Sequence, residues 1–363
     1  MLLTEADGKA LLRAADIPTP PGQLVRAPIA PEIPGPWMVK AQVPAGGRGL
    51  AGLIRRADTP AAVEDALRAL LGATHRGHRA GACLIEQVAV GAEHYLAIVL
   101  DPAGYGVRLL HRAAGGVAVE AGGRLAGTRL PPDPAAIEAA LPRLLPPVVV
   151  PVAARLARLV LSRELALAEI NPLFVTAIGA VAGDARIVID LNALPRQPAL
   201  AARIAADPDA YPDAIRRHEN GFDYVTLDPA GRIGLLTTGA GLSMMLIDEM
   251  AAAGARPLNF CDIRTSMLRG SPARIIAALG WMAAASELRA ILVNIFAGIT
   301  DLAEFAGLLA EALVARPVAV PVIARLVGRN ATEAAAILAS RAPGVVLEPD
   351  LTRALARAVE AAR

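Results

Sequence analysis

The chain has 363 residues, long enough for two domains, and because 55% of them are hydrophobic but only 3% aromatic, alanine, leucine and valine must fill the cores. A net charge of +2 excludes the strong field with which many proteins attract nucleic acid or an anionic membrane, so any phosphate binding must be local. The two cysteines lie far apart in unrelated contexts, which argues for a reducing compartment and against a disulfide framework or a zinc site.

The N-terminal stretch, residues 1–18, predicts a short helix. Glu5 and Asp7 occupy positions where a signal peptide would be basic and then apolar. The most apolar stretch, residues 145–162, contains three prolines and two arginines, so it is not typical of a membrane span. We therefore expect a soluble cytoplasmic protein with no membrane or nucleic-acid partner.

A lysine stands before a glycine-rich run in "VKAQVPAGGRGLAGL", residues 39–53. Only two of the 36 basic residues are lysines, Lys9 and Lys40. The residues around Lys40 predict a strand, and the glycines after it would let backbone N–H groups approach a phosphate beside a compact ammonium charge. The Walker A pattern G-x-x-x-x-G-K-[ST] is absent. A hairpin turn with a surface lysine is the competing interpretation.

The stretch "CLIEQVAVGAEHYLAIVLD", residues 83–101, predicts two strands joined by a short hinge. Backbone groups of such a hinge could meet a purine edge, and the carboxylate of Glu86 or Glu93 could hold a ribose hydroxyl. Two solvated glutamates at a strand connection are the alternative, and by themselves these residues favour it.

Oxygen-bearing side chains lie on or beside apolar runs further along the chain: Glu169, Asn171, Asp184 and Asp190. "EINPL" followed by "GDARI" is typical of a hairpin with its polar residues at one end. Carboxylate and amide oxygens suit Mg²⁺, which takes few protein ligands and completes its shell with water and substrate phosphates. Ordinary turn chemistry at Asn-Pro and Gly-Asp is the alternative.

Five strand–helix units follow one another in the second half, which predicts a doubly wound parallel sheet. Ligands of such sheets bind past the carboxyl ends of the strands, here the loops "TTGAGLS", "CDIRTSMLRGS" and "FAGITDL". Gly239 and Gly241, at a helix start, are suited to an anion. A proline- and charge-rich piece, residues 196–224, separates the halves, and we place the boundary near residue 220. No histidine stands in a catalytic context.

Taken together, these motifs resemble a known pattern. The chain is similar, nearly from end to end, to the β subunit of succinyl-CoA synthetase and its relatives, the ADP-forming carboxylate–CoA ligases. The motifs that carry the resemblance, in family order, are "LLTEADGKALLRAADIPTP", "VKAQVPAGGRGLAG", "EINPL", "DAR…DLNALPRQP", "GAGLSM", "NIFAGI" and "VIARLVGRN".

The resemblance implies an α/β protein with an N-terminal ATP-grasp domain, residues 1–219, and a C-terminal flavodoxin-like ligase domain, residues 220–363. It implies ATP on Lys40, Gly47, Arg48, Gly49, Glu86 and Glu93, with Ala89 in the hinge facing the base; Mg²⁺ on Asn171 and Asp184; Glu169 near a phosphate-exchanging histidine; and an acyl or phosphate site at Thr238, Gly298, Ile299 and Thr300. The histidine and the CoA site would belong to a partner α subunit, which fits the absence of a convincing histidine here.

The sequence departs from the family at several of these motifs. A family histidine is Pro44 here and the lysine after the glycine loop is Leu50, while the asparagine before "GAGL" is Thr238. The glycine cluster of the family's "DVGGGA" loop is replaced by "DIRTSM", which brings the Arg264 side chain to the expected substrate site. A later family glycine is Ala297. The nucleotide half is thus better kept than the substrate half, which suggests a divergent paralogue.

We therefore expect the nucleotide-binding subunit of a heteromeric acid–CoA ligase. ATP and Mg²⁺ would drive formation of a CoA thioester from a small dicarboxylate such as succinate or malate, through the partner's phosphohistidine. Two alternatives stay open: a single-chain ATP-grasp carboxylate–amine ligase, and a non-catalytic scaffold subunit that still binds nucleotide.

Overall fold

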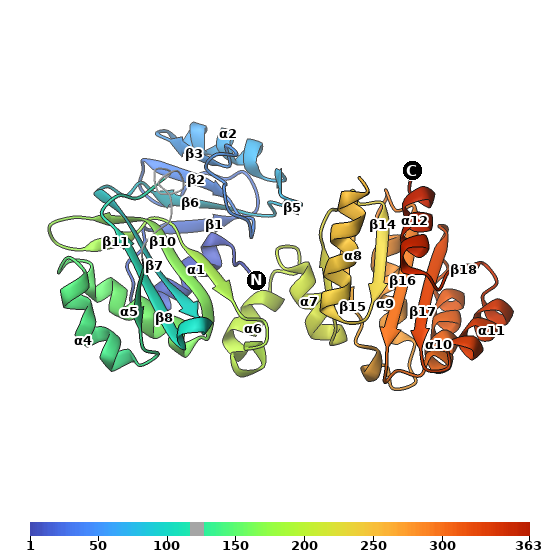
Figure 1. Cartoon of the computed structure of the whole chain (residues 1–363). Helices are drawn as coiled ribbons and strands as arrows, with labels where there is room; N and C mark the ends of the chain where they lie inside the picture. The colour runs from blue at the N-terminus through green and yellow to red at the C-terminus, as the bar shows by residue number, and fades with distance from the viewer. Residues whose placement is uncertain (117–126) are drawn as a thin grey trace. The chain divides into compact units, whose positions relative to one another are not determined.

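The computed structural model describes residues 1–116 and 127–363 (Figure 1). They form two compact units, Met1–Tyr211 and Pro212–Arg363, each of which is described by itself. Helix α7 (Pro212–Asn220), which the sequence placed before a boundary near residue 220, is part of the second unit.

The first unit is built on two antiparallel sheets and a small hairpin. The smaller sheet has the order β1-β6-β2-β3: β1 (Gly22–Val25), β6 (Cys83–Gln87), β2 (Trp37–Ala41) and β3 (Ile54–Ala57). The larger has the order β11-β10-β7-β8-β9, with β12 also paired to β10: β11 (Ala180–Ala182), β10 (Leu165–Val175), β7 (Ala92–Asp101), β8 (Gly106–Arg112), β9 (Gly127–Leu130) and β12 (Arg186–Ile189). The hairpin pairs β4 (Thr74–His75) with β5 (His78–Arg79).

The first unit contains the helices α1 (Glu5–Ala14), α2 (Pro60–Leu70), α4 (Pro134–Leu144), α5 (Val150–Ser162) and α6 (Pro198–Ala205), with 3-10 turns η1 (Pro102–Gly104) and η2 (Leu194–Arg196). Helices α1, α2 and α5 pack on the sheets, whereas α4 packs on α5 and α6 packs on η2. Val63 and Leu67 of α2 pack on Val39 and Ile85 of the smaller sheet. Helix α5, from the most apolar stretch of the sequence, packs on β10 and β7. Within the described residues, no helix is long and apolar enough to span a bilayer.

The second unit has one six-stranded sheet in the order β13-β15-β14-β16-β17-β18. Its strands are β13 (Asp223–Thr226), β14 (Ile233–Thr237), β15 (Asn259–Asp262), β16 (Ala290–Ala297), β17 (Val322–Gly328) and β18 (Val345–Leu347). All neighbours are parallel except β13, which pairs antiparallel with β15. The five parallel strands, numbered along the chain, have the flavodoxin-like order 2-1-3-4-5. The doubly wound sheet is confirmed, and β13 is an edge strand that the sequence did not predict.

Both faces of this sheet are covered by helices: α8 (Ala240–Ala252), α9 (Ala273–Ala283), α10 (Leu302–Ala315), α11 (Ala331–Arg341) and α12 (Leu351–Ala361), with a 3-10 turn η3 (Thr265–Met267). Alternate strand residues face opposite sides. Leu235 and Leu292 pack with α8 and α12, whereas Leu236 and Val293 pack with α9, α10 and α11. In this topology a ligand crevice lies where the strand order reverses, between the carboxyl ends of β14 and β16.

Candidate functional site

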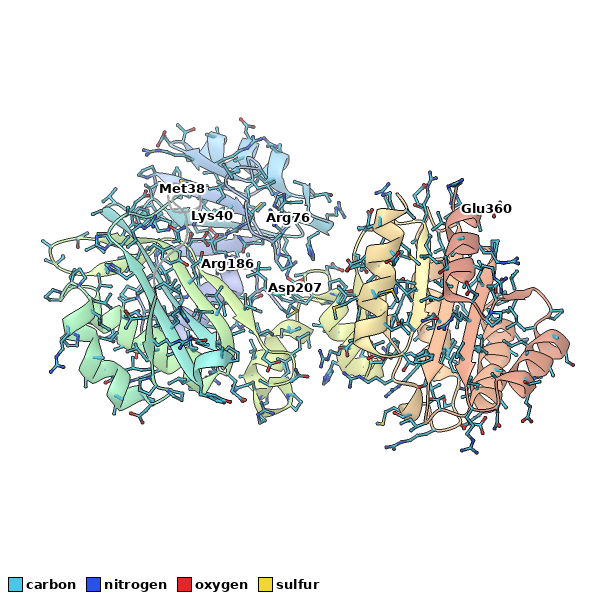
Figure 2. The ribbon with its side chains drawn as sticks, in the orientation of Figure 1. Met38, Lys40, Arg76, Arg186, Asp207 and Glu360 are labelled. Carbon is cyan, nitrogen blue, oxygen red and sulfur yellow. The ribbon has the colours of Figure 1, made fainter. Side chains whose placement is uncertain are left out.

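A cavity of about 730 Å³ lies in the first unit, where the glycine loop meets strands from both sheets. The residues that the resemblance implies for nucleotide and Mg²⁺ all line it, together with Glu169, which it places near a phosphate-exchanging histidine: Lys40, Gly47, Arg48, Gly49, Glu86, Ala89, Glu93, Glu169, Asn171 and Asp184. Figure 2 shows Lys40 and Arg186, two cations of this lining. Residues far apart in the sequence are therefore brought to one place.

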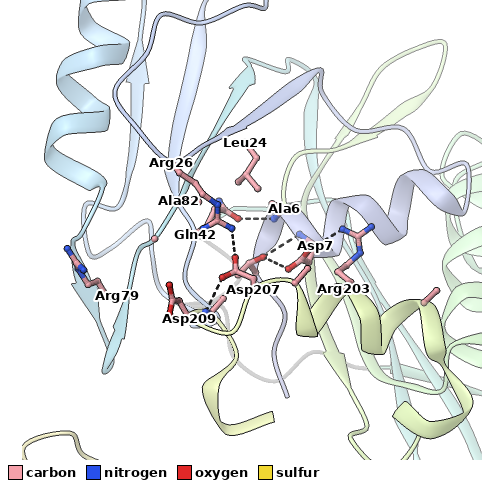
Figure 3. A pocket seen from close by; sticks show the side chains of 15 residues that line it. Ala6, Asp7, Leu24, Arg26, Gln42, Arg79, Ala82, Arg203, Asp207 and Asp209 are labelled. Atoms are coloured by element: carbon pink, nitrogen blue, oxygen red, sulfur yellow. Dashed lines mark hydrogen bonds and ion pairs between the residues drawn. The ribbon is translucent and has the colours of Figure 1, made fainter. Parts of the chain in front are cut away.

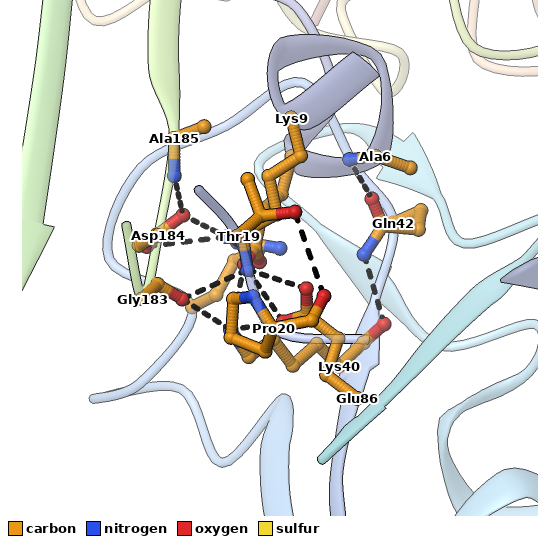
Figure 4. Close-up of polar contacts among 12 residues, drawn as sticks. Ala6, Lys9, Thr19, Pro20, Lys40, Gln42, Glu86, Gly183, Asp184 and Ala185 are labelled. Carbon is orange, nitrogen blue, oxygen red and sulfur yellow. Dashed lines mark hydrogen bonds and ion pairs between the residues drawn. The ribbon is translucent and has the colours of Figure 1, made fainter. Parts of the chain in front are cut away.

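Lys40 is buried at the end of β2, so it is not a surface lysine. Its Nζ lies 2.6 Å from Glu5, 2.8 Å from Glu86 and 2.8 Å from the backbone oxygen of Gly183 (Figure 4). Burial by itself would lower the pKa of Lys40, but the two carboxylates raise it above its ordinary value, so the ammonium stays charged.

Two residues of α1 complete this buried network, and sequence reasoning missed both as site residues. Lys9 Nζ lies 2.8 Å from Glu5 and 2.6 Å from Glu86 Oε1. Burial lowers the pKa of Lys9, against the pull of these carboxylates. Two signals could have found the pair. Lys9 is the only other lysine of the sequence besides Lys40, and Glu5 precedes it by one helical turn, a spacing that lets their side chains meet.

Arg48 links the glycine loop to the same network. Its Nη2 lies 2.7 Å from Glu5 and 3.2 Å from Asp184, and its Nη1 donates to Ala41 O at 3.1 Å. Gly47 has φ +80°, a left-handed conformation that favours glycine. Leu50, which the resemblance places at a family lysine position, is exposed. The loop thus lines the cavity with backbone atoms and with the guanidinium of Arg48, which Glu5 and Asp184 hold in place.

The hinge between β6 and β7 lies on the cavity wall, with Ala89 among the lining residues. Glu86 is 1% exposed and bonded to Lys9, so it is not a solvated glutamate. Glu93 is exposed at the start of β7. Of the two predicted ribose ligands, Glu86 is already paired with Lys9 and Lys40. Glu93 lies outside this network of cations.

Asn171 and Asp184 present oxygen atoms to the cavity from β10 and from the turn before β12. Asn171 Oδ1 accepts from Gly116 N at 2.6 Å, and Asp184 Oδ1 accepts from Ala185 N at 2.6 Å. Burial and the nearby Glu5 raise the pKa of Asp184. The described residues hold no cluster of three or more acidic, histidine or cysteine ligands. The side-chain oxygens of Asn171 and Asp184 are suitable ligands for Mg²⁺, whose other coordination positions would be filled by phosphate and water.

Glu169 and Asp190 are the other carboxylates weighed for metal. Of these two, only Glu169 lines the cavity. Glu169 lines the cavity and accepts from Tyr95 Oη at 3.1 Å and from Arg186 at 3.4 Å. Burial raises its pKa. Asp190 instead accepts from Asn192 N at 2.8 Å, as a turn residue does, and is not part of the lining.

In the second unit, three threonine hydroxyls meet at the carboxyl ends of adjacent strands. Thr265 Oγ1 lies 3.3 Å from Thr238 Oγ1 and 2.7 Å from Thr300 Oγ1. The sequence predicted Thr238 and Thr300 but not Thr265, which lies in the altered "DIRTSM" loop. Gly298 and Ile299 are exposed beside them.

The helix start at Gly239 and Gly241 already has a carboxylate partner, because Gly239 N donates to Asp262 Oδ1 at 3.0 Å. Arg264, predicted to face the substrate, has φ +52° and donates from Nη2 to Asp223 Oδ2 at 2.6 Å. Its guanidinium is therefore engaged by strand β13, which the sequence had not revealed.

A second cavity of about 410 Å³ in the first unit holds none of the predicted residues (Figure 3). Two pairs of its charged side chains are ion-paired: Arg26 lies 2.9 Å from Asp207, and Arg203 lies 3.2 Å from Asp7.

Two family models match the chain, one for an ATP-grasp domain over residues 2–124 and one for a CoA-ligase over residues 236–359. The chain is 36% identical to the β subunit of the ADP-forming succinate–CoA ligase of Chloroflexus aurantiacus, over 99% of each chain. It is 35% identical to subunit beta 2 of the ADP-forming enzyme of Streptomyces coelicolor, over 95% of this chain and 93% of the relative. It is 33% identical to the β subunit of the GDP-forming enzyme of Thermus thermophilus, over 93% of each.

Among solved structures, the chain is similar in fold to the ATP citrate lyase of Methanothrix soehngenii, with a TM-score of 0.73, 19% identity and 99% coverage of both chains. The expected combination of an ATP-grasp domain and a CoA-ligase domain is confirmed.

Proposed function

The chain belongs to the succinate–CoA ligase β-subunit family, and on that premise we propose that it is the nucleotide-binding subunit of an acid–CoA ligase whose α subunit carries the CoA site and a phosphohistidine. Residues 1–219 would form the ATP-grasp domain and residues 220–363 the ligase domain. The cytoplasmic location stays a prediction.

One observation carries this proposal: the nucleotide residues expected from the family gather around one cavity of suitable size in the first unit. The backbone N–H groups of Gly47 and Gly49 would face phosphate oxygens. Lys40 and Arg48 would neutralise charge there. Ala89 would meet the base, and Glu93 would hold a ribose hydroxyl.

Asn171 and Asp184 would hold Mg²⁺ against the nucleotide, since both present oxygen atoms to this cavity. Bound there, the ion would neutralise charge that develops on the transferred phosphoryl group. The protein's own part is to fix the two oxygens. The hydrogen bond from Gly116 N to Asn171 and that from Ala185 N to Asp184 support this role.

Glu169 would meet the partner's histidine when that residue enters the cavity. A carboxylate that accepts a hydrogen bond from one imidazole nitrogen orients the other nitrogen toward the phosphoryl group. Tyr95 and Arg186 hold Glu169 in one position, which supports such an orienting role.

The acid would bind at the crevice of the second unit, near Thr238, Thr265 and Thr300. Hydroxyl groups can donate to a carboxylate or to a hydroxyl of the acid, so a dicarboxylate more polar than succinate, such as malate, is the acid we expect. A screen of acids with the assembled complex tests this. Succinate emerging as clearly the best substrate would contradict it.

The two alternatives differ in what they predict for the isolated chain. A single-chain carboxylate–amine ligase would turn over ATP without a partner. A scaffold subunit would bind nucleotide but support no thioester formation. The engagement of Arg264 by Asp223 and of Gly239 by Asp262 in the altered substrate region is the observation that favours the scaffold alternative.

The deciding experiment incubates the purified chain with γ-labelled ATP, alone and with the α subunit. We expect acid-labile label only on the α subunit, and CoA thioester only in the mixture, because in-line phosphoryl transfer needs the carrier histidine at contact distance. Thioester made by this chain alone would overturn the proposal. Label on neither chain would favour the scaffold alternative.

A further inference from the structure

The cations that line the nucleotide cavity differ in whether a carboxylate already holds them. Lys40 and Arg48 lie 2.6 and 2.7 Å from oxygens of Glu5. Arg186 lies 3.4 Å from Glu169. A phosphate that bound to one of these cations would compete with an existing carboxylate partner.

Arg76 is the fourth cation of the lining, and within residues 1–116 and 127–363 it makes no ion pair. It is exposed, and its Nη2 reaches the glycine loop, since a Cβ added at Gly47 would lie 3.5 Å from that nitrogen. Figure 2 labels both Arg76 and Lys40. Its full charge and its donors are therefore available to a ligand.

The hairpin β4–β5 holds Arg76 in this position. His75 pairs with His78, so Arg76 and Gly77 form the two-residue turn, with φ +48° and +82°. Turns with two positive φ values favour asparagine, aspartate or glycine, and an arginine there is unusual. His75 Nε2 lies 2.9 Å from Gly46 O, which joins the hairpin to the glycine loop.

We propose that Arg76 is a further nucleotide-binding residue, which donates to the phosphates of the nucleotide from across the glycine loop; this rests on the proposed function. Planar guanidinium groups make paired, charge-assisted hydrogen bonds to phosphate. Arg76 at the hairpin tip and the backbone of the glycine loop would then contact the phosphates from two sides. The unpaired charge of Arg76 would let it bind them without breaking any of the buried pairs of Lys40 and Arg48.

The test is a calorimetric titration of the full chain with Mg-ATP, Mg-ADP and adenosine. For Arg76→Ala we expect roughly five- to tenfold weaker binding of both phosphorylated nucleotides, because a partly exposed charge-assisted contact is lost. Adenosine affinity should not change, since it carries no phosphate. Arg76→Lys should retain part of the affinity, because it keeps the charge but loses the planar fork.

Arg79→Ala is the matched control: it removes another exposed arginine from the same hairpin, but one that lines the second cavity. Wild-type affinity in this control supports the inference. If wild-type protein binds nucleotide and Arg76→Ala binds it equally well, the inference is overturned while the proposed function stands. An equal loss in Arg79→Ala would also overturn it, because net charge alone would then explain the loss. Absence of nucleotide binding by the wild type would contradict the proposed function itself.

Discussion

Glu5 is the carboxylate on which three cations of the first unit converge. Lys9, Lys40 and Arg48 each place a nitrogen between 2.6 and 2.8 Å from it. Burial would raise the pKa of Glu5, but these cations hold it well below its ordinary value. The carboxylate is thus ionised, and it keeps the cations of the cavity in place from the N-terminal helix.

Glu5→Gln should lower the free energy of unfolding by about 3 kcal/mol at neutral pH, because it leaves buried cations without their counter-charge. Urea denaturation measures this. Glu64→Gln is the control: Glu64 pairs with Arg68 on the exposed face of α2, where such a change is expected to cost less than about 0.5 kcal/mol.

The stability difference between the wild type and Glu5→Gln should also depend on pH. Because the pKa of folded Glu5 is lowered, its stabilisation is complete above the ordinary carboxyl pKa of about 4.3 and is lost as the pH falls through that value toward the folded pKa. Glutamine does not titrate, so the stability difference between wild type and Glu5→Gln should narrow in acid. A difference that stays constant from neutral to acid pH would mean that Glu5 acts through packing.

Asp184→Asn should weaken nucleotide binding about tenfold in the presence of Mg²⁺, or about 1.4 kcal/mol, and less in its absence. A carboxylate binds the ion by charge as well as by its oxygen, whereas the amide keeps only the oxygen. Asp190→Asn is the control, since Asp190 is a turn residue outside the cavity. Equal losses with and without metal would show that Asp184 holds the loop through Arg48 rather than binding the ion.

At the scale of elements, the loop between β15 and α9 carries the "DIRTSM" sequence, where the resemblance to the family leads us to expect an altered substrate site. Thr265→Val removes the hydroxyl that bridges Thr238 and Thr300 and keeps a similar shape. If these hydroxyls recognise a hydroxylated dicarboxylate, the ratio of kcat/KM for malate to that for succinate should fall about tenfold or more. An unchanged ratio, with both rates lowered alike, would indicate that the threonines only support the loop.

The strand–helix units of the second half could be predicted because each combines a short apolar run with a helix of period 3.6. Strand β13 could not, since it is short, contains Asp223 and follows a charged helix. Its discovery changes the interpretation of Arg264. A sequence pattern placed that arginine at the substrate loop, but only the sheet order shows that Asp223 lies close enough to bind it.

At the scale of the whole molecule, motif order predicted the family, and the residues that we propose for nucleotide binding line one cavity. The contacts of α1 were not predictable in the same way. Glu5 and Arg48 are remote in sequence, and no local pattern predicts the ion pair between helix α1 and the glycine loop. Arg76 was missed because a two-residue turn is ordinarily a connection rather than a binding element.

Because every residue that lines the nucleotide cavity lies within the first unit, Mg-ATP should stabilise that unit selectively. Nucleotide at about 100 times its dissociation constant adds about 2.7 kcal/mol to the state that binds it. Hydrogen exchange should therefore slow in peptides from residues 1–211 and stay unchanged around the threonines of the second unit. Equal protection throughout residues 212–363 would contradict the assignment of the cavity.

The burial of both lysines has a practical consequence for work with this chain. Lys9 and Lys40 are its only side-chain amines, and both lie in the ion-paired network beside the cavity. Amine-directed cross-linkers and labels will thus find no exposed lysine on the folded chain. For the same reason, acylation of Lys40 would report the opening of the network around the cavity, so that a simple mass-spectrometric footprint of two residues could follow that opening in the intact protein.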